Sequence, residues 1–153
     1  MTRYKHTQIG HVVIWAVLAI SVVVAIGTIS QPSRSHEISV VISLVLLVTI
    51  PLFFKLRIEI DDQTLLASFG IGVIRKKVPL AQIIACAPIR IRWWYGWGIH
   101  LTPYGWLYNV SGLDAVATTL RNGRKFALGT DDPHGLVAAI WRFSSAEKDL
   151  LPR

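Results

Sequence analysis

The sequence predicts two membrane-spanning helices in a hairpin, followed by a mostly-β domain that ends in a helix. Three observations predict this fold class. Apolar residues dominate the first third of the chain, where Arg34 and Glu37 are the only formal charges between residues 8 and 54. From residue 55 onward, apolar and polar residues alternate with the two-residue period of strands. After Pro133 the apolar residues recur at helical spacing.

Composition restricts the classes of partner. The chain has 153 residues, of which 16% are charged, against a usual fraction of about 25%. Its net charge of +7 favours anionic partners, either lipid headgroups or nucleic acid. The single cysteine, Cys86, excludes an intramolecular disulfide, and one Cys with five scattered His forms no zinc-type pattern. We therefore expect no metal and no cofactor.

Two apolar runs predict the spans. Residues 9–29 are long enough to cross a hydrocarbon core of about 30 Å as a helix. Residues 38–54 are at the short limit for a span, and Lys55 and Arg57 follow at once. The first run is longer than the apolar core of a signal peptide, and a second run follows it. These features favour two retained helices over a cleaved leader.

The distribution of charge predicts the topology. Residues 30–37 form a short connecting loop with one basic residue, so the helices should be antiparallel. The N-terminal tail, residues 1–8, carries Arg3 and Lys5, and the segment after the second span is basic too. The positive-inside rule then places both termini and the β domain in the cytoplasm. The opposite orientation stays open as the alternative, because few charges decide.

Residues 55–146 predict a barrel of about seven antiparallel strands with a C-terminal helix. Strand patterns cover residues 56–60, 65–69, 73–78, 83–89, 98–102, 106–110, 114–120 and 125–128. Asn122-Gly123 predicts a tight hairpin between the last two strands. Asp131 and Asp132 precede Pro133, which predicts helix caps and not a pair of catalytic acids. Residues 147–153 are expected to be a C-terminal tail.

This order of elements resembles the pleckstrin-homology (PH) superfold, and the details look like bacterial PH-like domains of small membrane proteins. The likeness covers about residues 56–142 and is carried by WWYGWGI (93–99), TPYGWLYNVSG (102–112), LRNGR (120–124) and GTDDP (129–133). It implies a multi-pass protein of a bacterial inner membrane. One departure concerns the loop at residues 61–63, Asp-Asp-Gln, where phosphoinositide-binding PH domains are basic. An acidic loop repels phosphate, which disfavours such a site there.

The candidate contact residues lie in a basic, aromatic stretch. Residues 63–113 carry five basic side chains and no acidic one, and four of the six tryptophans lie between residues 90 and 108. Such a mixture suits a membrane interface or a peptide groove. The alternatives are core packing for the aromatic rings and a solvated strand face for the basic group. The candidates are Arg90, Arg92, Trp93, Trp94, Tyr95, Trp97, Arg75 and Lys77.

The other reactive residue types predict no catalysis. His100 falls in a strand pattern and Cys86 in an apolar strand, where both are expected to be structural. The sequence has no phosphate loop, nucleophile elbow or HExxH motif, so we expect no enzyme. A nucleic-acid motif is absent as well. The leading hypothesis is a membrane-anchored module that binds a protein or anionic lipid, and the alternative is a structural or assembly subunit of a membrane complex.

Overall fold

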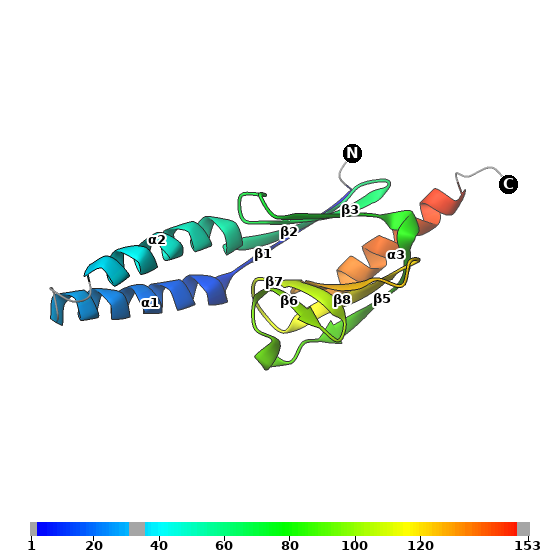
Figure 1. Ribbon diagram of the computed structural model, residues 1–153. Helices are drawn as coiled ribbons and strands as arrows, with labels where there is room; N and C mark the ends of the chain where they lie inside the picture. Colours follow the sequence, from blue (N-terminus) through cyan, green and yellow to red (C-terminus); the bar gives the residue numbers. More distant parts are fainter. Residues whose placement is uncertain (1–2, 31–35, 150–153) are drawn as a thin grey trace.

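The computed structural model describes residues 3–30 and 36–149 of the chain (Figure 1). Two apolar helices project from one end of a β domain, and a third helix ends the described chain. The helices are α1 (His11–Ser30), α2 (His36–Phe53) and α3 (Pro133–Asp149), with short 3-10 helices η1 (Leu80–Gln82) and η2 (Trp93–Tyr95). Of the expected loop at residues 30–37, residues 31–35 lie outside the described residues, and residues 36 and 37 belong to α2.

The apolar helices α1 and α2 match the expected spans to within two residues at each end. Both are long and apolar enough to cross a membrane, with mean hydropathy of 2.8 and 2.1. Their side chains are largely exposed: only Val17 is buried in α1, and no residue is buried in α2. The two helices meet along one side, where Thr28 Oγ1 donates a hydrogen bond to Ser39 Oγ at 2.8 Å.

Nine strands of the described residues form two sheets, where about seven were expected. Eight of them fall on the strand patterns of the sequence, and the ninth is β1. Sheet A has the order β1-β2-β3-β4, with β1 (Tyr4–Ile9), β2 (Lys55–Ile60), β3 (Thr64–Phe69) and β4 (Arg75–Pro79). Sheet B has the order β5-β8-β9-β7-β6, with β5 (Ile83–Arg90), β6 (Gly98–Thr102), β7 (Gly105–Asn109), β8 (Asp114–Leu120) and β9 (Lys125–Gly129).

The expectation that all strand pairs are antiparallel is wrong for β7 and β9, which pair in parallel. The cause is the order of sheet B. The chain runs from β7 into β8, but β9 returns from the hairpin and inserts between them. Two reversals of direction separate β7 from β9, so these neighbours point the same way.

Residues 4–9 are not a free tail, contrary to the expectation for residues 1–8. They form β1, which pairs with β2 from Tyr4↔Ile60 to Ile9↔Lys55. Two further contacts hold β1 in place: Gln8 Nε2 donates to the Ser111 carbonyl at 2.9 Å, and His6 pairs with Asp131. The α1–α2 hairpin therefore takes the place of the turn in a β-hairpin.

Two glycines allow the apolar helices to lie directly against sheet A. Gly10 N donates to the Phe54 carbonyl at 2.8 Å, joining the start of α1 to the end of α2. Gly70 follows β3 with φ of +50°, and its N–H donates to the Lys55 carbonyl at 2.8 Å. A Cβ at residue 70 would lie 1.9 Å from the Pro51 carbonyl oxygen, so no larger residue fits there.

The main core lies between the two sheets and α3. It combines Phe69 of sheet A, Leu128 of sheet B and Ile140 of α3, all at most 1% exposed. Burying one large aliphatic or aromatic side chain contributes about 1.5–3 kcal/mol. Both sheets and α3 contribute to this one main core of the domain.

The predicted turn and cap chemistry is confirmed at the C-terminal end. Arg124 N donates to Asn122 Oδ1 at 3.1 Å in the β8–β9 hairpin. Asp132 Oδ1 accepts from Gly135 N at 2.9 Å, as an N-cap does. The expected tail at residues 147–153 is helical to Asp149, and residues 150–153 lie outside the described part.

Candidate functional site

The aromatic segment, residues 90–97, folds over the outer face of sheet B. Ile91 anchors it: the side chain is 3% exposed, and Ile91 N donates to the Leu113 carbonyl at 2.6 Å. Ile91 packs with Leu107, Ala115 and Ala127 in a small second core, and Tyr95 packs against the same cluster. Two of the segment's apolar side chains therefore serve as anchors.

The tryptophans of η2 point away from this second core. Trp93 is 70% exposed and Trp94 is 55% exposed. Their rings meet edge to face at 5.9 Å, and the Arg92 guanidinium lies 4.9 Å from the centre of the Trp94 ring. Core packing therefore does not describe Trp93 and Trp94, although it does describe Tyr95. Arg90 is exposed as well.

A chain of hydrogen bonds places the aromatic segment at the end of the β domain that carries α1 and α2. Trp97 Nε1 donates to the Gly112 carbonyl at 3.2 Å. The adjacent Ser111 carbonyl accepts from Gln8, which lies two residues before Gly10 and the start of α1. In Figure 1 the short green helix η2 accordingly lies toward the end from which α1 and α2 emerge.

Arg75 and Lys77 lie elsewhere, on the outer face of sheet A. Arg75 lines a pocket of about 430 Å³ together with Lys55 and Arg57. Lys77 lines the neighbouring hollow, which also contains Asp61. The structure therefore divides the predicted residues between two surfaces. Arg57 was missed as a site residue: alternation alone places residues 55, 57 and 59 on one face, but only the strand register shows what lies beside them.

Burial raises the pKa of titratable side chains in the β domain, Cys86 and Tyr4 among them. Burial raises the pKa of the Cys86 thiol to about 11, which keeps the sulfur protonated. Burial, with Asp132 and Asp131 nearby, raises the pKa of Tyr4 to about 12. His100 Nε2 contacts the Trp97 carbonyl at 2.6 Å, a structural role. Within residues 3–30 and 36–149, no group of three or more His, Cys, Asp or Glu side chains could hold a metal ion.

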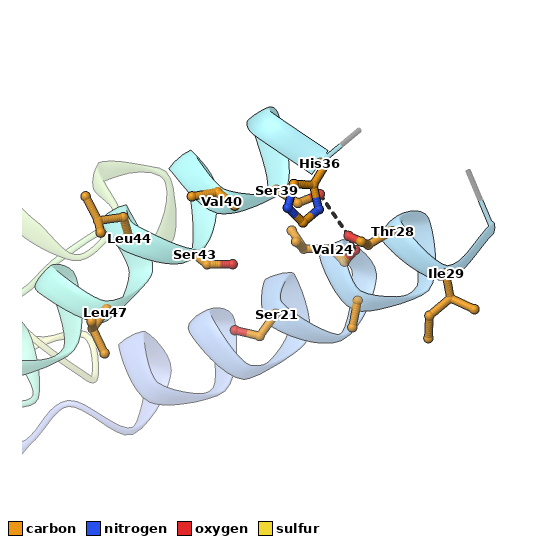
Figure 2. Close-up of a pocket in the computed structure, with 11 residues that line it drawn as sticks. Ser21, Val24, Thr28, Ile29, His36, Ser39, Val40, Ser43, Leu44 and Leu47 are labelled. Carbon is orange, nitrogen blue, oxygen red and sulfur yellow. Dashed lines mark hydrogen bonds between the residues drawn. The ribbon is translucent and has the colours of Figure 1, made fainter. Parts of the chain in front are cut away.

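A groove between α1 and α2 is the other large concave feature (Figure 2). It has a volume of about 720 Å³. Small polar side chains, Ser21, Ser39 and Ser43, line it together with apolar ones such as Val24 and Leu44. Ser21 Oγ is already bonded to the carbonyl of Val17, one turn earlier.

Comparison with known proteins finds no relative of this chain. The chain matches no protein-family model, and no curated protein or solved structure matches it. The two surfaces and the apolar helices described above are therefore the features that bear on its function.

Proposed function

We propose that this chain is a non-enzymatic, membrane-anchored binding module with a PH-like β domain at the cytoplasmic face of a bacterial inner membrane. In this proposal α1 and α2 span the bilayer, and the aromatic segment contacts its anionic surface. The observation that carries it is the exposed Trp93–Trp94 pair beside Arg92, at the end of the domain next to the helices.

The exposure of the apolar helices supports membrane anchoring. Side chains such as Val23 (69% exposed) and Leu47 (70% exposed) are not covered by other side chains in the described part of the chain. Leaving so many apolar groups in water would cost about 25 cal/mol for each Å² of apolar surface. A hydrocarbon environment removes that cost, since lipid tails are as apolar as the side chains.

The position of the charges supports the cytoplasmic orientation. Strands β1 and β2 both join the helices at the same end, so the N-terminal strand and the β domain lie on one side. Lys5 and Arg57 lie on these two strands. The positive-inside rule favours the cytoplasm for that side.

The aromatic segment suits the bilayer surface for two physical reasons. Tryptophan rings favour the headgroup region, where one edge stays polar and the ring body leaves water. Each basic residue near an anionic surface adds about 1 kcal/mol of attraction. Arg92, stacked on Trp94, combines both properties at a single point.

A fluorescence experiment tests the proposal. In full-length protein carrying Cys86→Ala, Trp94→Cys would be labelled with an environment-sensitive dye and reconstituted into nanodiscs containing phosphatidylglycerol. We expect blue-shifted emission and quenching by spin-labelled lipid. The full chain is needed because β1 completes sheet A, and residues 55–153 alone would lack it.

A label at Asn122→Cys is the matched control. Residue 122 is exposed in the β8–β9 turn, where Arg121 N bonds to the Gln82 carbonyl at 2.8 Å, next to η1. That turn lies at the end of the domain opposite the helices in Figure 1. We expect no quenching there. If the two labels are quenched to the same extent, the aromatic segment does not face the bilayer and the proposal fails.

The groove between α1 and α2 favours a second candidate, an assembly subunit of a membrane complex. Its small side chains would let another helix approach closely. This candidate predicts that a stoichiometric membrane partner co-purifies with the chain and is lost when Ser43 is replaced by Phe. Co-purification that is unchanged in Ser43→Phe would argue against docking in the groove.

A further inference from the structure

The pocket on the outer face of sheet A has the geometry of an anion site. Register aligns Arg57 of β2, Ser68 of β3 and Arg75 of β4 in one row across three strands. Neighbouring strands lie about 4.8 Å apart, so the two arginine backbones are about 10 Å apart with Ser68 between them. A serine in the middle leaves space and offers a hydroxyl donor.

The cations of this row have no anionic partner among the described residues. Arg57 Nε is shielded from solvent and has no hydrogen-bond partner among the described residues. Arg75 Nε donates to the Gly72 carbonyl of its own turn. Within the described part of the chain, neither arginine nor Lys55 forms an ion pair with a carboxylate. A shielded, unpaired donor is costly, and an oxyanion would satisfy it.

The next row of sheet A differs from this one. There Lys5, Glu59, Leu66 and Lys77 align, and Lys5 Nζ lies 3.8 Å from Glu59 Oε1. Glu59 is the one carboxylate that lines the pocket, and Lys5 partly neutralises it. The Arg57–Ser68–Arg75 row alone combines two arginines with no acidic residue.

The outward-facing charges of β2 change from basic to acidic along the strand. The outward residues run Lys55, Arg57, Glu59 and then Asp61, so the basic end adjoins α2 and the acidic end is remote. At about 3.4 Å per residue, Asp61 lies about 20 Å farther from α2 than Lys55 does. That is more than twice the Debye length of about 8 Å at physiological salt. An anionic surface at the end of α2 would therefore attract the basic end with little repulsion from Asp61.

The turn beside the pocket adds an apolar contact. Ile71 N donates to the Pro51 carbonyl at 3.0 Å, which ties the β3–β4 turn to the last turn of α2. Ile71 and Val73 on this turn are 66% and 69% exposed. A phosphate beside apolar side chains is the arrangement at the boundary between lipid headgroups and acyl chains, whereas a free phosphate ion needs no apolar neighbour.

We propose that Arg57, Ser68 and Arg75, with Lys55 at the rim, bind the phosphate group of an anionic membrane phospholipid. This inference rests on the membrane anchoring proposed above, and it adds a defined headgroup site separate from the aromatic segment. Arginine suits the role because its planar fork donates two parallel hydrogen bonds to a phosphate.

The test is lipid binding by full-length protein in an uncharged detergent. The probes are short-chain phosphatidylglycerol, short-chain phosphatidylcholine and inorganic phosphate, and the readout is the Kd. We expect phosphatidylglycerol to bind most tightly and Arg57→Gln to weaken it about tenfold, the loss of one charge-assisted hydrogen bond. Arg75→Gln should act in the same direction.

Lys77→Gln is the matched control, because residue 77 lies on the same strand and the same face one row farther from α2. We expect its Kd to stay within about twofold of the unmodified chain, since an exposed charge one row away contributes little. Melting temperatures of all three variants would show whether a loss of binding reflects unfolding.

Three results would overturn the site. They are equal Kd values for Arg57→Gln, Arg75→Gln and Lys77→Gln, inorganic phosphate binding as tightly as the lipid, or no preference for phosphatidylglycerol over phosphatidylcholine. The dye experiment at residue 94 is independent of these outcomes. Quenching there together with unchanged lipid binding in Arg57→Gln would reject this pocket and leave the proposed function standing.

Discussion

The apolar helices and the β core are built from the same residue types and end in opposite environments. Strand β2 buries Leu56, Ile58 and Ile60 to 1% exposure or less. Helix α2, equally rich in Val, Ile and Leu, buries none of its residues. Hydrophobicity alone therefore does not show whether a segment is buried inside the protein or exposed on its surface.

The largest expected effect comes from truncating the same side chain in the two regions. Leu65→Ala, at a residue with 0% exposure, should lower the free energy of unfolding by about 2–5 kcal/mol through lost burial and a cavity. Leu18→Ala, at a residue with 49% exposure in α1, should leave the melting temperature of the β domain unchanged. Equal losses would show that α1 belongs to the same packed core.

An introduced arginine should have a large effect in α1 and a small effect on the exposed face of the β domain. Val22→Arg, near the middle of α1, should disfavour membrane insertion by about 2.5–3.5 kcal/mol. Leu101→Arg, at a 71% exposed residue of β6, should change stability by about 0.5 kcal/mol at most. Carbonate extraction of cell membranes measures the first and thermal melting the second. Unchanged extraction of Val22→Arg would contradict a spanning α1.

A smaller effect is expected where the apolar helices touch each other. Thr28→Val removes the hydrogen bond to Ser39 and should weaken helix pairing by about 0.6 kcal/mol. Thr49→Val is the control, because Thr49 Oγ1 donates to the Val45 carbonyl of its own helix at 2.8 Å. Cysteine cross-linking between the helices in detergent would compare the two variants. Identical cross-linking would assign no role to the Thr28–Ser39 contact.

The smallest effect concerns the acidic end of sheet A. Hydrogen bonds from the backbone of Gln63, then the Thr64 hydroxyl, lower the pKa of Asp61 below its ordinary value. Its contribution to stability is therefore present above the unfolded pKa of about 3.9 and lost as the pH falls through the folded pKa. Asp61→Ala should cost about a few tenths of a kcal/mol at pH 6, because solvent screens the group. The difference should vanish at low pH in thermal melts.

Most elements could be predicted from local patterns, and β1 shows why one could not. Its inward residues are Tyr4, His6 and Gln8, which give no apolar alternation. Its partner β2 is separated from it by the whole helical hairpin. The parallel pairing of β7 and β9 was missed for a similar reason, since it depends on where β9 inserts.

The sequence predicted the composition of the candidate site but not the arrangement of its side chains. The stretch around Trp93 and Trp94 was identified from its aromatic and basic composition, but the sequence left core packing and contact open. Only the anchoring of Ile91 and Tyr95 on sheet B decided which rings face outward.

The sequence by itself determined the two apolar helices, the strand periods, the hairpin at Asn122 and the cap at Asp132, because each depends on neighbours within a few residues. Only the tertiary structure decided that the helices interrupt a β-hairpin and that Arg57, Ser68 and Arg75 form one row. The physical reason is that strand pairing joins residues that are distant in sequence. Periodicity shows which face of a strand a side chain occupies, and register alone shows which side chains from other strands lie beside it.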